Sequence, residues 1–181
     1  MRIAAVDVTA LGSTPVLGLI SLLAAILMIL LRRWREALLI AAGIAGGVEI
    51  GQVLKHGFSR ERPDVLYHAV EAHNSSFPSG HAMASTAVFL ILAIVVARLT
   101  PDRTTRAVVL VAALACALLV GLSRIYLGVH WTSDVVAGWS VGAAWALACG
   151  LATLPRQARQ ASSLSIATPA PACRATNRPA G

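Results

Sequence analysis

Five apolar stretches, each close to the length needed to cross a lipid bilayer, leave this chain few possible folds. They cover roughly residues 14–31, 37–54, 82–98, 106–122 and 135–153. A helix needs about 20 apolar residues to span the hydrocarbon layer, and helices satisfy their own backbone groups there. Hydrophobic residues make up 57% of the chain and charged residues only 13%, outside the usual range of soluble domains. We predict an all-α, multi-pass transmembrane helix bundle.

The distribution of the apolar stretches divides the chain into three parts. Residues 1–13 are expected to form a short extracytoplasmic or interfacial segment, and residues 14–154 the transmembrane domain. Residues 155–181 lack any apolar period and predict a disordered cytoplasmic tail. The net charge of +7 could indicate a nucleic-acid partner in a soluble protein, but in this chain we expect none.

The placement of the cationic residues predicts the orientation in the membrane. Ten of the fifteen fall in the loops and tail on one side of the predicted spans, which the positive-inside rule assigns to the cytoplasm. The other five are Arg2, Lys55, Arg60, Arg62 and Arg124. The side with fewer cations therefore faces outward, as expected of a protein in the inner (plasma) membrane.

Three polar motifs interrupt the apolar sequence, and all fall on that outward side. They are Lys55-x6-Arg62-Pro63, Pro78-Ser79-Gly80-His81 and Ser123-Arg124-x5-His130-x3-Asp134. Lys55 is the only lysine among the fifteen cationic residues, which indicates a position that prefers an ammonium group.

The spacing of His130 and Asp134 suggests a carboxylate that orients an imidazole. Residues four apart share one face of a helix, and a carboxylate bound to one ring nitrogen leaves the other free to attack phosphorus. The alternative is that Asp134 only caps the last span and that His130 is an interfacial histidine.

The other two motifs supply groups that suit an anion. Ser79 and Gly80 stand where the third span begins, and free backbone amides at a helix N-terminus bind anions. His81 can donate a proton near neutral pH. Lys55, Arg62 and Arg124 lie at one face of the membrane, where they could clamp phosphoryl oxygens or, individually, serve as interfacial anchors.

Together the motifs resemble the signature of the type 2 phosphatidic acid phosphatase superfamily, K-x6-RP, PSGH and SR-x5-H-x3-D, without a substitution. The resemblance implies that His130 attacks phosphorus, that Asp134 orients it, and that His81 protonates the leaving group and then assists water. It implies phosphate binding by Lys55, Arg62, Ser79, Gly80 and Arg124. Family members typically have six helices, so the five predicted spans correspond to that fold without its first helix.

The resemblance implies a metal-independent lipid phosphatase that acts through a phosphohistidine and needs no cofactor. Its substrate would be phosphatidic acid, phosphatidylglycerol phosphate or undecaprenyl diphosphate, and membrane lipids would surround it; the oligomeric state stays open. Two alternatives remain: an oxidoreductase like the vanadium haloperoxidases, which share a similar signature, and a phospholipid-binding protein without turnover.

Overall fold

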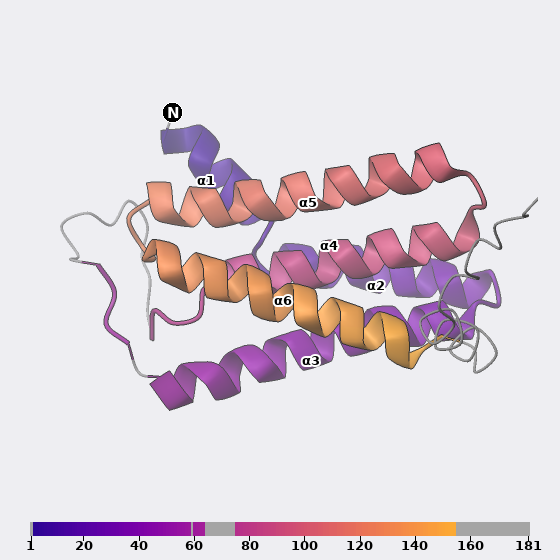
Figure 1. Ribbon diagram of the computed structural model, residues 1–181, viewed down its shortest axis with the longest axis horizontal. Helices are drawn as coiled ribbons and strands as arrows, with labels where there is room; N and C mark the ends of the chain where they lie inside the picture. The colour runs from indigo at the N-terminus through magenta and orange to yellow at the C-terminus, as the bar shows by residue number, and fades with distance from the viewer. Residues whose placement is uncertain (1, 59, 64–74, 155–181) are drawn as a thin grey trace, which may run out of the picture.

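The computed structural model describes residues 2–58, 60–63 and 75–154, and in them the chain is all helical. The predicted tail, 155–181, and most of the segment between the first two motifs lie outside the described residues. Figure 1 shows the long helices running roughly side by side. The helices are α1 (Arg2–Ala10), α2 (Thr14–Leu30), α3 (Trp34–Phe58), α4 (Gly80–Leu99), α5 (Arg103–Tyr126) and α6 (Thr132–Ala152).

The helices match the predicted spans, with one difference at the N-terminus. The four helices α3 to α6 are each long and apolar enough to cross a membrane. The shorter α1 and α2 meet at a bend of 42° and together make a fifth candidate span. Pro15 lies in the first turn of α2, where its missing N–H leaves no intrahelical bond unmade. Residues 2–10, expected to be a short segment outside the spans, thus form a helix that packs against α5.

Helix α4 lies at the centre of the bundle, packed against α6, α5 and α3 (Figure 1). Two glycines of α6 allow its close approach to α4. A Cβ at Gly138 would lie 2.8 Å from the Ser79 carbonyl oxygen, and one at Gly142 would collide with the Met83 carbonyl oxygen. The two backbones therefore approach to distances that a side chain would prevent, as small residues permit in membrane helices.

Glycines of α3 also bring this helix close to its neighbours. A Cβ at Gly43 would meet Ile91 of α4, and one at Gly46 would meet the Trp145 ring of α6. A Cβ at Gly47 would have an ordinary contact distance, 3.9 Å from Ala87 Cβ. Gly43 and Gly46 are therefore the positions at which a side chain would disturb the packing of α3.

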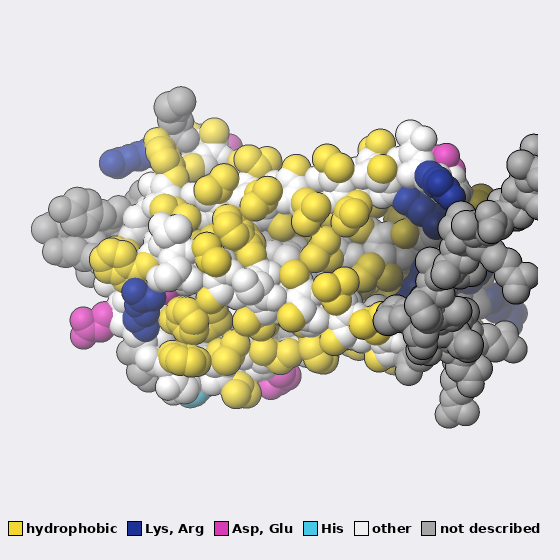
Figure 2. All heavy atoms as spheres, in the orientation of Figure 1, with side chains coloured by type: hydrophobic (Ala, Val, Ile, Leu, Met, Phe, Trp, Pro, Cys, Tyr) yellow, Lys and Arg dark blue, Asp and Glu magenta, His cyan; other side chains and the backbone are white. Residues whose placement is uncertain are grey.

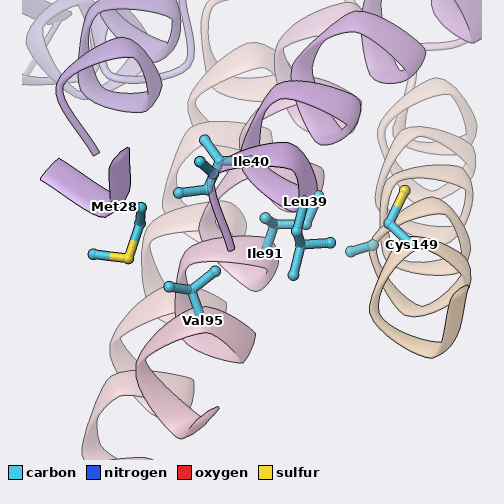
Figure 3. Close-up of a cluster of buried hydrophobic side chains, with 8 residues drawn as sticks. Met28, Leu39, Ile40, Ile91, Val95 and Cys149 are labelled. Atoms are coloured by element: carbon cyan, nitrogen blue, oxygen red, sulfur yellow. The ribbon is translucent and has the colours of Figure 1, made fainter. Parts of the chain in front are cut away.

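The hydrophobic core occupies the end of the bundle away from the polar motifs. Figure 3 shows side chains from α2, α3, α4 and α6 meeting there. Its buried members are Met28, Ala37, Leu39, Ile40, Ile91, Val95, Ala146 and Cys149. This apolar end fixes the relative positions of the helices that carry the polar residues at the other end.

The outer surface has the character of a membrane protein. Figure 2 shows hydrophobic side chains over the middle of the visible face and cationic side chains toward its two ends. Large apolar residues such as Leu23, Val111 and Leu147 are more than half exposed. A soluble domain rarely exposes so continuous an apolar surface, so the chain is an integral membrane protein.

Candidate active site

The structure brings the three motifs together at one end of the bundle. Lys55 lies in the last turn of α3, Ser79 is the N-cap residue of α4, and Arg124 lies in the last turn of α5. Arg62 precedes α4 in an irregular segment, and His130 precedes α6. Arg62 and His130, which are 68 positions apart in sequence, are therefore in contact in the fold.

The end of α5 explains where His130 lies. Gly128 has φ 71°, a left-handed conformation that glycine adopts without strain. The Gly128 amide donates to the Ile125 carbonyl at 3.0 Å and the Val129 amide to the Arg124 carbonyl at 3.3 Å, which is the bonding pattern of a Schellman cap. This cap ends α5 and leads the chain directly to His130.

The prediction that His130 and Asp134 share a helix face is wrong, although the two residues do meet. His130 lies in the link before α6, because α6 begins at Thr132. Asp134 is the third residue of α6, and its Oδ2 accepts a hydrogen bond from the Trp131 amide at 3.0 Å. Asp134 therefore caps the helix, as the simpler alternative proposed. It also lies 3.6 Å from His130, measured from Oδ2 to Nδ1.

The surroundings of His130 define which ring nitrogen can act as a nucleophile. Arg62 Nη1 lies 3.3 Å from His130 Nε2, and a guanidinium can only donate. Nε2 therefore presents its lone pair toward Arg62, and the proton resides on Nδ1, on the side of Asp134. Burial, followed by the nearby charges of Arg62 and Arg124, lowers the pKa of His130 to about 3. The imidazole is thus neutral at physiological pH, as a nucleophile must be.

Ser79 and Gly80, which were predicted to bind an anion, stand at the start of α4. The Ser79 side chain is buried, and its hydroxyl makes no capping bond. Its backbone amide donates to the Asp134 carbonyl at 3.0 Å, which joins the start of α4 to the first turn of α6. A Cβ at Gly80 would lie 3.3 Å from Lys55 Nζ. The absence of a side chain therefore lets the ammonium lie against the helix N-terminus.

The three predicted phosphate-binding cations are close enough to repel one another. The charges of Arg62 and Arg124 both act on Lys55, and Arg62 acts on Arg124. Arg62 is held in place by a bond from Nη1 to the Val129 carbonyl at 2.8 Å. Arg124 is 6% exposed, and its Nη1 donates to Thr9 Oγ1 of α1 at 3.1 Å. Such a cluster of cations, opposed by the charge of Asp134, favours binding of an anion with several negative charges.

Buried polar atoms without a partner mark the same place. Among the described residues, four buried side-chain atoms lack a hydrogen bond: Ser79 Oγ, Arg124 Nε, His130 Nδ1 and Ser21 Oγ. Unsatisfied buried donors are destabilising and rare in proteins. Three of the four belong to the predicted site. His130 Nδ1 faces Asp134, whereas Ser79 Oγ and Arg124 Nε could bond a polar ligand.

A cavity of about 180 Å³ reaches the first turn of α4, although Ser79, Arg124 and His130 are not among the residues that line it. Lys55, Gly80 and His81 line its polar end, and it extends between α2, α3 and α4. It shares Gly47 and Val48 with a smaller apolar recess of about 20 Å³ deeper in the bundle. The site thus continues from a cationic end into an apolar groove.

Three residues of the site were not predicted from sequence. Arg60 pairs with Asp134, Ser76 donates its hydroxyl to the same carboxylate, and Thr9 binds Arg124. Thr9 lies in a helix that was expected to be a peripheral segment. Within the parts of the chain that the structure describes, no three His, Cys, Asp or Glu side chains form a possible metal site.

Several curated phosphatases are similar to this chain in sequence. Phosphatidylglycerophosphatase B of Bacillus subtilis is 38% identical over 94 residues, which are 51% of this chain and 46% of that protein. Decaprenylphosphoryl-5-phosphoribose phosphatase of Mycobacterium tuberculosis is 38% identical over 115 residues, 62% of this chain and 58% of that protein. The chain thus spans about half the length of these curated relatives.

Solved structures show the same helical arrangement. The transmembrane PAP2 type phosphatidylglycerolphosphate phosphatase from Bacillus subtilis superposes with a TM-score of 0.76 at 30% identity, over 82% of this chain and 74% of that one. Aquifex aeolicus LpxE superposes with a TM-score of 0.61 at 25% identity, over 84% of each chain. The family model of the PAP2 superfamily matches residues 36–157, which include all three motifs. The chain therefore belongs to the PAP2 superfamily.

Proposed function

We propose that this chain is a membrane phosphatase that removes a phosphate group from a lipid phosphate or lipid diphosphate through a phosphohistidine. The observation that carries the proposal is that two buried, unpartnered donor atoms, Ser79 Oγ and Arg124 Nε, lie in the same cationic cluster as His130. A phosphoryl group would accept hydrogen bonds from the Ser79 and Arg124 atoms, and its charge would offset the repulsion between the cations.

In the first step, His130 Nε2 attacks phosphorus. A bond forms between nitrogen and phosphorus while the bond from phosphorus to the leaving oxygen breaks, and the leaving oxygen takes the electron pair. His81, which lines the cavity beside Lys55, supplies a proton to that oxygen. Asp134 stabilises the positive charge that develops on the imidazole.

In the second step, water attacks the phosphohistidine. His81 accepts a proton from the water, the bond between nitrogen and phosphorus breaks, and inorganic phosphate leaves. His130 and His81 return to their starting states, so the balance is one water consumed for each phosphate released. Lys55, Arg62 and Arg124 stabilise the equatorial oxygens in both steps, and no metal or other cofactor takes part.

The apolar groove favours a lipid over a soluble phosphate ester. It continues from Lys55 and His81 to Leu17 and Val88, between α2, α3 and α4. A substrate held by its phosphate at the cationic end could place the first carbons of an acyl or prenyl chain there, because the recess of about 20 Å³ holds little more than one water-sized group. The names of the relatives, phosphatidylglycerophosphatase and undecaprenyl-diphosphatase among them, also describe lipid phosphates.

The test is phosphate release by the purified protein in detergent. The substrates are phosphatidic acid, phosphatidylglycerol phosphate, undecaprenyl diphosphate and, as a head-group control, a short water-soluble phosphate ester. We expect release from at least one lipid, preference for it over the soluble ester, and loss of release in His130→Ala. Tight binding of the lipids without release would instead support a binding protein without turnover.

We further propose that the site faces the outside of the inner membrane, as the cation count predicts. An introduced cysteine at exposed Glu61, beside the site, reports on this end of the bundle. One at exposed Thr104, near the start of α5, reports on the other end. In intact cells and a cysteine-free background, a membrane-impermeant thiol reagent should label Glu61→Cys and not Thr104→Cys. The opposite pattern would reverse the topology.

A further inference from the structure

Arg60 reaches the buried acid of the site although it occupies one of the unspecified x positions of the first motif, Lys55-x6-Arg62-Pro63. Its Nη1 donates to Asp134 Oδ1 at 2.8 Å and to Ser133 Oγ at 2.8 Å. The Asp134 side chain is completely buried, whereas the Arg60 side chain is 43% exposed. The guanidinium therefore extends from the surface to a carboxylate that solvent does not reach.

The second oxygen of Asp134 is held from another direction. The Ser76 hydroxyl and the Trp131 amide both donate to Oδ2. Ser76 is fully buried, and its backbone amide donates to the Arg60 carbonyl at 2.8 Å. Arg60 and Ser76 thus form a connected pair that fixes both oxygens of one carboxylate.

Arg60 and Arg62 lie on opposite sides of the pair formed by His130 and Asp134. Arg62 contacts His130 at Nε2, the nitrogen that would attack phosphorus. Arg60 contacts the carboxylate that lies near Nδ1, the other nitrogen. The guanidinium carbon of Arg60 lies 5.9 Å from the centre of the Trp131 ring, which restrains it on its outer side. These contacts direct Arg60 toward the carboxylate rather than toward the phosphoryl site.

We infer that Arg60 is a positioning residue for the reaction: it fixes Asp134, and through Asp134 the ring of His130, without contacting the phosphate. The inference rests on the proposed function for its kinetic consequence. In metal sites, removal of a residue that orients a ligating side chain from behind typically lowers activity about 10- to 100-fold, and we expect a loss of that size here. Because the phosphate contacts remain, substrate affinity should change little.

The test is a double-mutant cycle on kcat with the variants Arg60→Gln, Asp134→Asn and the double variant. We expect Arg60→Gln to lower kcat about 10- to 100-fold with KM within about twofold, and Arg60→Lys to restore part of the loss. In the Asp134→Asn background, removal of Arg60 should lower kcat no further. Arg62→Gln should raise KM in either background, and Glu61→Gln, an exposed neighbour, should match the wild type.

Two kinetic results would overturn the inference. One is an equal loss of kcat on removing Arg60 from the wild type and from the Asp134→Asn variant, because Arg60 would then act independently of the carboxylate. The other is a tenfold rise of KM in Arg60→Gln, which would make Arg60 a phosphate-binding residue. If Arg60→Gln does not fold, the same double-mutant cycle is measured with Arg60→Lys. A lysine at this position cannot make the planar contacts of the guanidinium.

A measurement without substrate separates this inference from the proposed function. In protein labelled with 15N-histidine, the ring resonances of His130 are those lost in His130→Ala. We expect Arg60→Gln to shift them in the wild type, and to cause no further shift in the Asp134→Asn variant. Unshifted resonances in Arg60→Gln would refute the positioning role, even if the protein released phosphate from none of the lipids.

Discussion

The contact between α6 and α4 at Gly138 holds the two halves of the site together, and Gly138→Ala tests this directly. A Cβ there would lie 2.8 Å from the Ser79 carbonyl oxygen, 3.1 Å from the Met83 amide nitrogen and 3.1 Å from Ala82 Cβ. Two of these are backbone atoms, which cannot rotate away. Overpacking of this kind typically destabilises a protein by about 1–3 kcal/mol.

Relief of the collision requires α6 to move away from α4 by a few tenths of an ångström. That shift would stretch the bond from the Ser79 amide to the Asp134 carbonyl, now 3.0 Å, and displace the nucleophile from the anion site. Since a misplacement of about 1 Å can lower a rate about 100-fold, we expect kcat to fall about tenfold, together with a lower melting temperature.

The assay is phosphate release and thermal unfolding of the same detergent preparation. Gly57→Ala is the matched control, because a Cβ at Gly57 meets none of the described residues within 4 Å. It should preserve activity and leave the melting temperature unchanged or slightly higher. If Gly138→Ala matched Gly57→Ala in both measurements, the close packing of α4 and α6 would not be what aligns the site.

Three other changes have defined outcomes. The pKa of His130 is about 3 in the folded protein and 6.5 ordinarily. Between pH 3 and pH 6.5 the His130 ring is therefore protonated in the unfolded chain and neutral in the folded one. Stability should therefore fall as the pH is lowered through that window, by at most about 1.4 kcal/mol per pH unit; an equally pH-dependent melting temperature in His130→Gln would contradict this. Thr9→Val removes the hydroxyl that accepts a hydrogen bond from Arg124 Nη1 and should raise KM several-fold, whereas Thr9→Ser keeps the hydroxyl and should not. Equal KM values for the two variants would exclude a role for the bond between Thr9 and Arg124. Asp102 caps α5, and hydrogen bonds from the Thr105 hydroxyl and then from the Thr105 and Thr104 amides lower the pKa of its carboxyl. Asp102→Ala should therefore lower the melting temperature and leave kcat unchanged. Any loss of kcat would show that the far end of the bundle affects the site.

The sequence was sufficient to predict the helical membrane fold and the grouping of the motifs at one end. Both follow from local patterns. The length of each apolar stretch predicts a span, and every second connection between successive spans lies on the same face of the membrane. The family resemblance to the PAP2 superfamily is confirmed. The roles of His130, His81 and the phosphate-binding residues remain proposals supported by the geometry.

What the sequence did not reveal depends on contacts between distant segments. Arg60 and Ser76 lie 74 and 58 positions from Asp134, and neither stands at a specified motif position. Thr9 lies 115 positions from Arg124. The placement of His130 outside α6 had a local signal, since a glycine such as Gly128 commonly ends a helix, but the four-residue spacing to Asp134 suggested a continuous helix instead.

The most direct test of the central claim, that His130 carries the phosphoryl group, is to trap the intermediate. The protein is mixed with a 32P-labelled lipid phosphate that it hydrolyses, quenched with alkali and digested. We expect label that is stable to alkali and labile to acid, as a phosphohistidine is, on the peptide containing His130, and none in His130→Ala. Label on any other residue, or undiminished label in His130→Ala, would contradict the account.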